Sequence, residues 1–217
     1  MKKKTVIAIA LLLLFSTITL QKIEISKFNI KEIEIENNFI LKENEIKKLL
    51  IPLYEKNLFF LSNAEIENAL MQNSFIESFN IKKKYPQILR IKIFEKKPIA
   101  IVFYKKKNYY LSKKIELIEF TKLPKYEDLP YVIGDYKKFK ELFVILEKLN
   151  FPLYTVKRFA LYESNRWDIE TKNNQIIKLP VINFEESLNN YLNMKTKSEF
   201  KKYRIFDFRI NNQLILK

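Results

Sequence analysis

The chain of 217 residues contains no cysteine and no histidine, and its only glycine is Gly134. Without cysteine, neither a disulfide framework nor a thiolate metal site can form. Without histidine, the chain lacks the most common general base and the most common metal ligand. A single glycine also excludes the glycine-rich loops that cradle phosphate groups. We therefore expect a non-enzymatic protein with no catalytic residues, no metal site and no cofactor.

The charge of the chain is strongly basic, with 40 lysine and arginine residues against 25 acidic residues, a formal net charge of +15. Such an excess favours anionic partners. However, the two signs are interspersed, and the basic–aromatic motifs of nucleic-acid recognition modules are missing. We therefore predict a solvated basic surface, with no nucleic acid and no small-molecule substrate as a partner. The triplet at residues 82–84 is interpreted as a solvated strand face, with contact to lipid head groups or to a partner as the alternative.

The amino-terminal segment combines three lysines at residues 2–4 with an uncharged, mostly apolar run at residues 5–20. This run is just shorter than the roughly 17–25 residues that usually span a bilayer. We expect a retained transmembrane anchor over residues 5–20, with residues 1–4 as a short cytoplasmic tail. Residues 21–27 then form a linker. The alternative is a signal peptide that is cleaved after its apolar region.

Residues 28–97 show the pattern of one small unit of strands and helices. Residues 28–36 alternate as a strand, and apolar residues repeat at helical spacing over residues 43–54 and 62–72. Ser62 and Glu65 form a capping box at the start of the second helix. Two alternating runs then meet at Tyr85 and Pro86, which predicts an antiparallel hairpin over residues 76–97. The predicted order is β-α-α-β-β.

Residues 98–217 contain many short alternating runs and two amphipathic segments. Helices are predicted at residues 139–149 and 184–194. Strands are predicted at residues 99–104, 109–112, 115–120, 156–162, 166–171, 176–179, 204–210 and 213–217. Consecutive asparagines, which replace glycine at left-handed backbone positions, mark turns at residues 173–174 and 211–212. The second unit is therefore predicted to be a mostly antiparallel β domain with two helices.

Four stretches, in this order, carry a resemblance to the FtsQ/DivIB family of bacterial cell-division proteins. They are Ile-Glu-Ile-Glu-Asn at residues 33–37; Tyr-Pro at 85–86, followed by Glu-Lys-Lys-Pro-Ile-Ala at 95–100; Leu-Pro at 129–130 with Gly134; and Arg-Trp-Asp at 166–168, continuing through Leu-Pro at 179–180 to Phe-Asp-Phe-Arg at 206–209. The chain departs from the family pattern at residues 112–114, where Ser-Lys-Lys replaces the expected aspartate and glycine.

The resemblance implies an α+β fold: a single transmembrane helix, a POTRA-like domain at residues 28–97 and an FtsQ-type β domain at residues 98–217. It also implies a non-enzymatic scaffold of the divisome, at the septum in the bacterial inner membrane. The amino terminus would be cytoplasmic and the bulk of the chain periplasmic. The implied partners are FtsB-like and FtsL-like bitopic proteins, together with FtsK and proteins of the FtsW and FtsI types. The inner membrane itself would be contacted through residues 5–20.

The last predicted strand, at residues 213–217, follows a tight turn and should lie at a sheet edge. Unpaired N–H and C=O groups at such an edge are a template for strand addition by a partner. By analogy with the family, the residues that would touch the partner are Ile210, Gln213, Leu214, Ile215 and Leu216. Leu216 is expected to be an exposed edge residue that contributes little to the core.

Other sequence features have structural interpretations or belong to a rival function. Trp167 is predicted to point inward, with Arg166 and Asp168 on the opposite face of its strand. Asp207 and Arg209 share a face and are expected to pair. The rival function is a secreted or anchored basic envelope protein, either a POTRA-type assembly factor or a protein that binds an anionic polymer.

Overall fold

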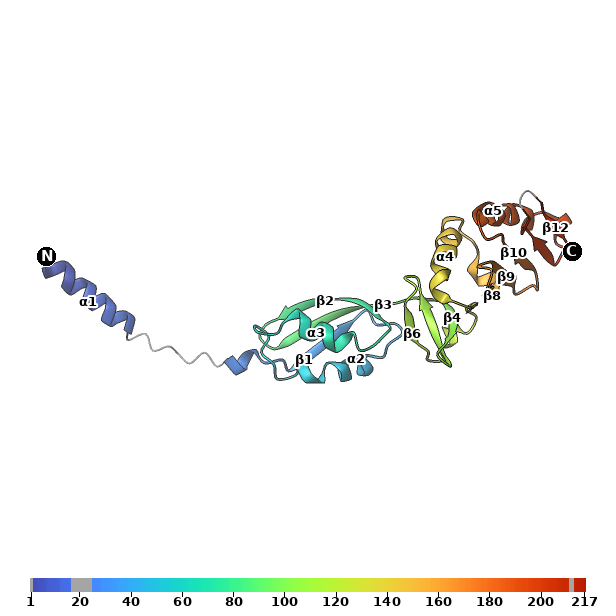
Figure 1. The fold of residues 1–217 in the computed structure, drawn as a ribbon. Helices are drawn as coiled ribbons and strands as arrows, with labels where there is room; N and C mark the ends of the chain where they lie inside the picture. Colours follow the sequence, from blue (N-terminus) through green and yellow to red (C-terminus); the bar gives the residue numbers. More distant parts are fainter. Residues whose placement is uncertain (1, 17–24, 211–212) are drawn as a thin grey trace. The chain divides into compact units, whose positions relative to one another are not determined.

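The computed structural model describes residues 2–16, 25–210 and 213–217 (Figure 1). Over these residues the chain is an α+β protein, and its contacts divide it into two compact units. The first unit consists of Met1–Gln72 and Phe79–Ile93, and the second of Asn73–Ser78 and Phe94–Lys217. The predicted domain boundary at residue 97 stays a prediction, because the hairpin just before it, at residues 76–95, contributes residues to both units.

The first helix, α1 (Lys2–Ser16), corrects the predicted transmembrane anchor. It has 15 residues, and lysines occupy its first turn, so only Thr5–Ser16 is uncharged. None of the helices in the described ranges is both long enough and apolar enough to cross a membrane. The prediction of a transmembrane helix over residues 5–20 is therefore wrong. Residues 17–20 of that prediction, and 21–24 of the predicted linker, lie outside the described residues.

The first unit has the predicted order of strands and helices after a short 3-10 turn, η1 (Ile25–Phe28). Its sheet has the order β1-β3-β2, with β1 parallel to β3 and Ile33 opposite Leu89. Helices α2 and α3 pack Ile46, Ile66 and Leu70 into its core. The bounds are β1 (Glu32–Glu36), α2 (Glu43–Leu49), η2 (Ile51–Leu53), α3 (Asn63–Leu70), β2 (Ile76–Lys84) and β3 (Ile88–Glu95).

Local sequence explains where the two helices of this unit begin and end. The predicted capping box is present: the Glu65 N–H donates to the Ser62 hydroxyl, and the Ser62 N–H donates to the Glu65 carboxylate. This arrangement satisfies backbone donors that the first turn leaves without partners. Helix α2 is shorter than predicted, because the chain tightens into the 3-10 turn η2, with Pro52 near its start.

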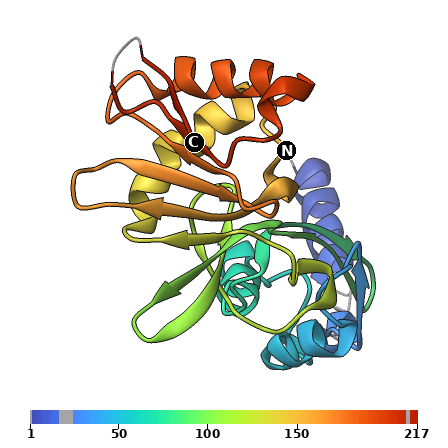
Figure 2. The ribbon, with the colours of Figure 1, turned by 90° about the vertical axis from the view of Figure 1, so that its right-hand side faces the viewer.

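The second unit is built on one nine-stranded sheet in the order β12-β11-β10-β9-β8-β7-β4-β5-β6 (Figure 2). The pairs β10–β11, β7–β8 and β4–β7 are parallel, and the other neighbours are antiparallel. Parallel neighbours need a crossover connection. Helix α4 (Phe139–Lys148) lies in the connection from β7 to β8, and α5 (Phe184–Lys195) in that from β10 to β11.

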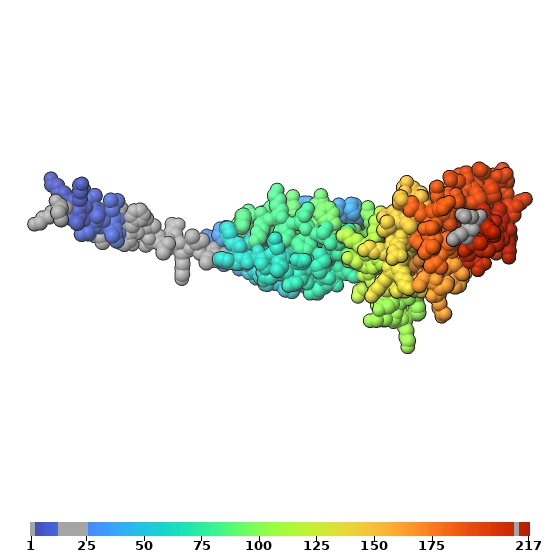
Figure 3. Space-filling model, turned by 45° about the horizontal axis from the view of Figure 1, so that its top comes forward, coloured from blue at the N-terminus to red at the C-terminus, as the bar shows by residue number. Residues whose placement is uncertain are grey.

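The strands of the second unit are short, and 3-10 turns link several of them. Its β4–β5 hairpin projects from the surface of the unit (Figures 2 and 3). The strand bounds are β4 (Pro98–Tyr104), β5 (Lys107–Ser112), β6 (Leu117–Glu119), β7 (Tyr131–Ile133), β8 (Val156–Leu161), β9 (Trp167–Thr171), β10 (Ile176–Lys178), β11 (Ile205–Asp207) and β12 (Ile215–Leu216). The 3-10 turns are η3 (Pro124–Tyr126), η4 (Tyr136–Lys138), η5 (Leu153–Thr155) and η6 (Ser198–Phe200).

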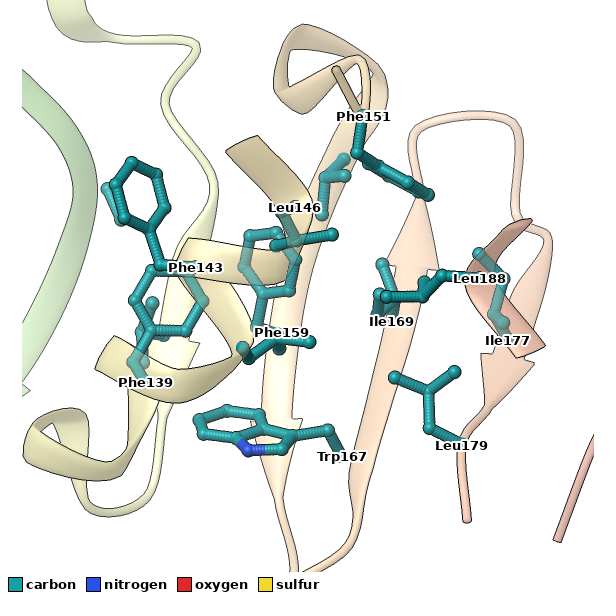
Figure 4. Packing of buried hydrophobic residues seen from close by; sticks show 14 of the residues in the cluster. Phe139, Phe143, Leu146, Phe151, Phe159, Trp167, Ile169, Ile177, Leu179 and Leu188 are labelled. Carbon is teal, nitrogen blue, oxygen red and sulfur yellow. The ribbon is translucent and has the colours of Figure 1, made fainter. Parts of the chain in front are cut away.

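The hydrophobic core of the second unit lies between the two helices and one face of the sheet (Figure 4). Phe139 of α4 contacts Phe159 of β8 and Trp167 of β9, with ring centroids 4.9 and 5.7 Å apart. Leu188 of α5 belongs to the same cluster and is fully buried. As predicted, Trp167 points into this core. Both crossover helices therefore pack against the same face, and α5 lies above the strands nearest to β12.

The single glycine sits where a side chain would not fit. Gly134 follows β7 with a φ of +100°, and a Cβ atom there would lie 2.9 Å from Cβ of Leu161. At this φ, L side chains are strained, whereas glycine is not. Elsewhere asparagine takes left-handed positions, among them Asn37, Asn165 and Asn174.

Candidate functional site: the C-terminal sheet edge

Strand β12 lies at one end of the nine-stranded order, as predicted from its place after a turn. It pairs antiparallel with β11, with Leu216 opposite Phe206 and Ile215 opposite Asp207. Within the described residues, no strand pairs with its other side. The predicted turn at residues 211–212 lies outside the described residues.

The backbone of Leu216 points its hydrogen-bonding groups away from β11. The Lys217 N–H donates to the Ile205 carbonyl at 3.1 Å, and the Ile205 N–H donates to the Lys217 carbonyl at 2.9 Å. In an antiparallel pair, residues that exchange hydrogen bonds alternate with residues whose groups face outward. The N–H and C=O groups of Leu216 are therefore the donor and acceptor that this edge presents to an added strand.

The side chains of this last segment divide between the two faces of the sheet. Leu214 and Leu216 are half-buried and pack against the hydrophobic core. Ile215, on the opposite face, is 38% exposed, and Ile210 is 52% exposed. The expectation that Leu216 contributes little to the core is therefore wrong. The apolar run at residues 214–216 hid the alternation, because leucine and isoleucine are equally apolar.

A groove of about 480 Å³ lies beside this edge, between α5 and the chain that leads into β12. Three of the five predicted site residues line it: Ile210, Gln213 and Leu214. The α5 wall carries polar side chains, and the rest of the lining is largely apolar. The other lining residues are Pro180, Ile182, Asn183, Glu186, Ser187, Asn190, Asn193, Met194 and Phe208. Sequence analysis missed this groove, because α5 and the terminal segment meet only in the folded chain.

A row of alternating charges crosses the sheet toward β12 on the face that carries Ile215. Lys178 of β10 lies opposite Asp168 of β9 on one side and opposite Asp207 of β11 on the other. The Arg209 guanidinium donates to both carboxylate oxygens of Asp207, at 2.8 and 2.6 Å. Arg166 Nε donates to Asp168 at 3.1 Å. The predicted pairing of Asp207 with Arg209 is confirmed.

The two carboxyl groups of this row have opposite pKa shifts. The hydrogen bonds from Arg209 lower the pKa of Asp207. Burial raises the pKa of Asp168, and the nearby Arg166 only partly offsets this effect. Two carboxyl groups whose pKa values diverge can serve as an acid and a base. Neither lines the groove beside the edge, and each already bonds to an arginine, so we interpret the row as structural.

Metal-ligand groups do not gather at this edge. Among the described residues, no cluster of three or more aspartate, glutamate, histidine or cysteine side chains could hold a metal ion. What the arrangement offers is a backbone donor and acceptor, an exposed Ile215 and an adjoining groove. These are the features of a surface that binds an extended peptide segment.

Comparison with known proteins shows which class of domain the first unit contains. Residues 28–96 match the family model described as "POTRA domain, FtsQ-type". The matched residues fold in the order β-α-α-β-β, and their sheet has the order β1-β3-β2. Residues 28–96 are thus similar to POTRA domains of the FtsQ type in both sequence and order of elements.

Most of the chain is also similar to proteins named for cell division. It is 28% identical to the cell division protein FtsQ of Rickettsia conorii over 197 residues, which cover 86% of this chain and 71% of that protein. The FtsQ protein of Rickettsia bellii matches with the same identity and coverage. The cell division protein DivIB of Clostridium tetani is 32% identical over 85 residues, 39% of this chain and 31% of its own. The predicted resemblance to the FtsQ/DivIB family is confirmed.

Proposed function

We propose that this chain is a non-enzymatic scaffold of the bacterial division machinery, located at the septum, and that it binds a partner by strand addition along β12. The similarity to FtsQ and DivIB proteins over most of the chain supports the role in division. The observation that carries the binding mode is the outward N–H and C=O of Leu216 on a strand that ends the sheet. Ile210, Gln213, Leu214, Ile215 and Leu216 form the proposed contact.

The groove suggests how a partner would continue beyond the added strand. Exposed Ile182 and Ile210 lie on its lining, with asparagine side chains of α5 nearby. An extended segment pairs its backbone with Leu216 and then places an apolar side chain in this groove. By the family resemblance we propose FtsB-like and FtsL-like segments as the partners here. FtsK and proteins of the FtsW and FtsI types are proposed as partners elsewhere on the chain.

The test distinguishes the contribution of the outward backbone N–H of Leu216 to binding from that of its side chain. Leu216→Pro removes the outward N–H without breaking a bond to β11, because that N–H points away from β11. Leu216→Ala is the matched control: it also shortens the side chain but keeps the N–H. Binding of the full chain to the periplasmic segment of the organism's own FtsB-like protein is measured by titration calorimetry.

We expect Leu216→Ala to bind with little loss of affinity and Leu216→Pro to bind much more weakly. Ile215→Lys, which puts a charge on the exposed face of the same strand, should also weaken binding. Equal affinities for the proline and alanine variants would refute strand addition at this edge while leaving the scaffold role intact. No binding by the unmodified chain would count against the proposed partner itself.

A further inference from the structure

Three aromatic side chains meet at one end of the POTRA domain, far along the chain from the C-terminal edge. Phe28 closes η1, Phe59 lies in the turn before α3, and Tyr85 lies in the β2–β3 turn. The ring of Phe59 is 4.7 Å from that of Phe28 and stacks on that of Tyr85 at 4.6 Å. These residues, together with the neighbouring Phe60, are called the aromatic end below.

The aromatic end is exposed rather than buried in the core of its domain. Phe59 is 55% exposed, Phe60 76% and Tyr85 51%. A turn built on Asn57 holds the two phenylalanines: its side chain accepts a hydrogen bond from the Phe59 N–H at 3.0 Å. Contiguous exposed aromatic residues on a soluble surface usually mark a contact with another apolar phase. The fold therefore fixes these rings in place although their outer faces meet no part of the domain.

Lysine residues neighbour these aromatic residues in the chain and across the adjoining turns. Lys27 precedes Phe28, the Lys31 N–H donates to the Gln87 carbonyl beside Tyr85, and Lys56 lies in the same turn as Phe59. Glu65 pairs with Lys56, and Glu55 is an exposed carboxylate of the same turn. The triplet at residues 82–84 is less solvated than predicted, because Lys83 donates to the Leu61 carbonyl and Lys84 pairs with Glu34. Among the residues that neighbour the aromatic end, lysines therefore outnumber glutamates.

The composition of this surface and its place in the chain point to one kind of partner. We propose that the aromatic end binds the surface of a bilayer containing anionic lipids, with Phe59, Phe60 and Tyr85 at the level of the head groups. Tyrosine favours the membrane–water interface, phenylalanine enters the apolar side of that interface, and lysines beside them are attracted to anionic head groups. Only a short stretch of chain separates Phe28 from the uncharged segment Thr5–Ser16 of α1, whose Val6, Ile7 and Leu12 are also exposed. Two exposed apolar surfaces this close in the chain can share one lipid interface.

The absence of cysteine makes a direct test possible in the full chain. Phe60→Cys introduces a single thiol at the aromatic end, and this thiol is labelled with the environment-sensitive fluorophore NBD. The matched control is Phe39→Cys, in the same domain, at a phenylalanine that is 81% exposed and follows the opposite end of β1. Each labelled protein is mixed with vesicles of phosphatidylglycerol and phosphatidylcholine in equal parts, and with vesicles of phosphatidylcholine alone.

We expect NBD at position 60 to brighten several-fold, shift to the blue and be quenched by lipids with a doxyl group near the head group, mainly on the anionic vesicles. NBD at position 39 should keep its aqueous spectrum. The same spectrum for both labels, whether aqueous or lipid-like, would overturn the proposal. The readout reports on position 60 alone, so attachment of α1 to the vesicles cannot imitate it.

As a second variant, Phe59→Ser in the chain labelled at position 60 removes the stacked neighbour but keeps the label. We expect it to lower the quenching by doxyl lipids at least twofold. Tyr154→Ser in the same labelled chain is the control, because Tyr154 is 78% exposed in the second unit. Equal quenching in these two variants would show that the label itself, and not the aromatic end, enters the lipid.

Discussion

Removal of the Tyr191 hydroxyl group tests how α5 is held against the sheet beside the candidate groove. Tyr191 is fully buried, and its ring meets that of Phe206 edge-on at 5.1 Å. Its hydroxyl donates to Gln175 Oε1 at 3.0 Å, and Gln175 Nε2 donates to the Tyr203 carbonyl at 3.1 Å. These hydrogen bonds link α5 to Gln175, just before β10, and to Tyr203, just before β11. Strand β11 in turn pairs with the terminal strand β12.

Tyr191→Phe keeps the ring and removes only the hydroxyl. A lost hydrogen bond that leaves a partner unsatisfied costs about 1–3 kcal/mol. Gln175 is half-buried, so water can partly replace the donor, and we expect a loss of about 1 kcal/mol. Urea unfolding followed by the fluorescence of Trp167, the only tryptophan, reports on this unit. Tyr154→Phe, at a highly exposed tyrosine, is the control and should change stability by less than about 0.5 kcal/mol.

The pH dependence gives the same variant a second, independent readout. Burial raises the pKa of Tyr191 to about 12, above the value of about 10 for an unfolded tyrosine. From pH 10 upward, the unfolded chain loses this proton while the folded chain keeps it, so the wild type loses stability. The Tyr191→Phe variant lacks this loss. The difference in unfolding free energy between the wild type and the variant should therefore shrink from pH 7 to pH 11. Burial also raises the pKa values of Tyr110 and Tyr126, but both proteins share these groups. Equal stabilities of the two proteins at pH 7, or a difference in unfolding free energy that grows as the pH rises, would refute the reasoning.

Three further substitutions test other parts of the structure by urea unfolding. Asp168→Asn should become more stable relative to the wild type as the pH rises from 3 to 7, because the raised pKa of Asp168 means that ionisation of this group destabilises the fold. A difference in unfolding free energy that does not change with pH would contradict this prediction. Ser62→Ala removes the cap of α3 and should cost about 1 kcal/mol, measured by circular dichroism against Ser26→Ala. Gly134→Ala should cost at least about 1 kcal/mol, and a neutral result would show that Leu161 moves freely aside.

The parts of the fold that could be predicted from sequence are those with a local cause. The capping box at Ser62 and Glu65 fixed the start of α3, and alternation placed Trp167 inward on β9. A hairpin turn at Tyr85 was predictable, because Pro86 cannot donate to a ladder. In each case the residues that decide the structure are neighbours in the chain.

Features that depend on distant segments could not be predicted in the same way. The parallel pairing of β10 with β11 requires α5 as a crossover, and no local sequence pattern predicts that pairing. The row of Asp168, Lys178 and Asp207 exists only because three strands align in register. The error over residues 5–20 has a different cause: composition shows that a segment is apolar, but not where its helix ends. The groove beside β12 likewise needs α5 and the terminal segment together.

The last strand shows why stability and the proposed binding can be tested separately at this edge. Leu214 and Leu216 face the core, so substitutions there change stability, whatever a partner does. Ile215 stands on the other face, opposite Asp207, whose carboxylate is already satisfied by Arg209. The fold thus takes its stabilisation from one face, and within the described residues the outward backbone of Leu216 and the exposed part of Ile215 meet no pairing strand. A strand that served only to close the sheet would be expected to carry a charged residue at Ile215, because charges are how natural edges resist pairing. An isoleucine at that position therefore favours the proposal that this edge pairs with a partner.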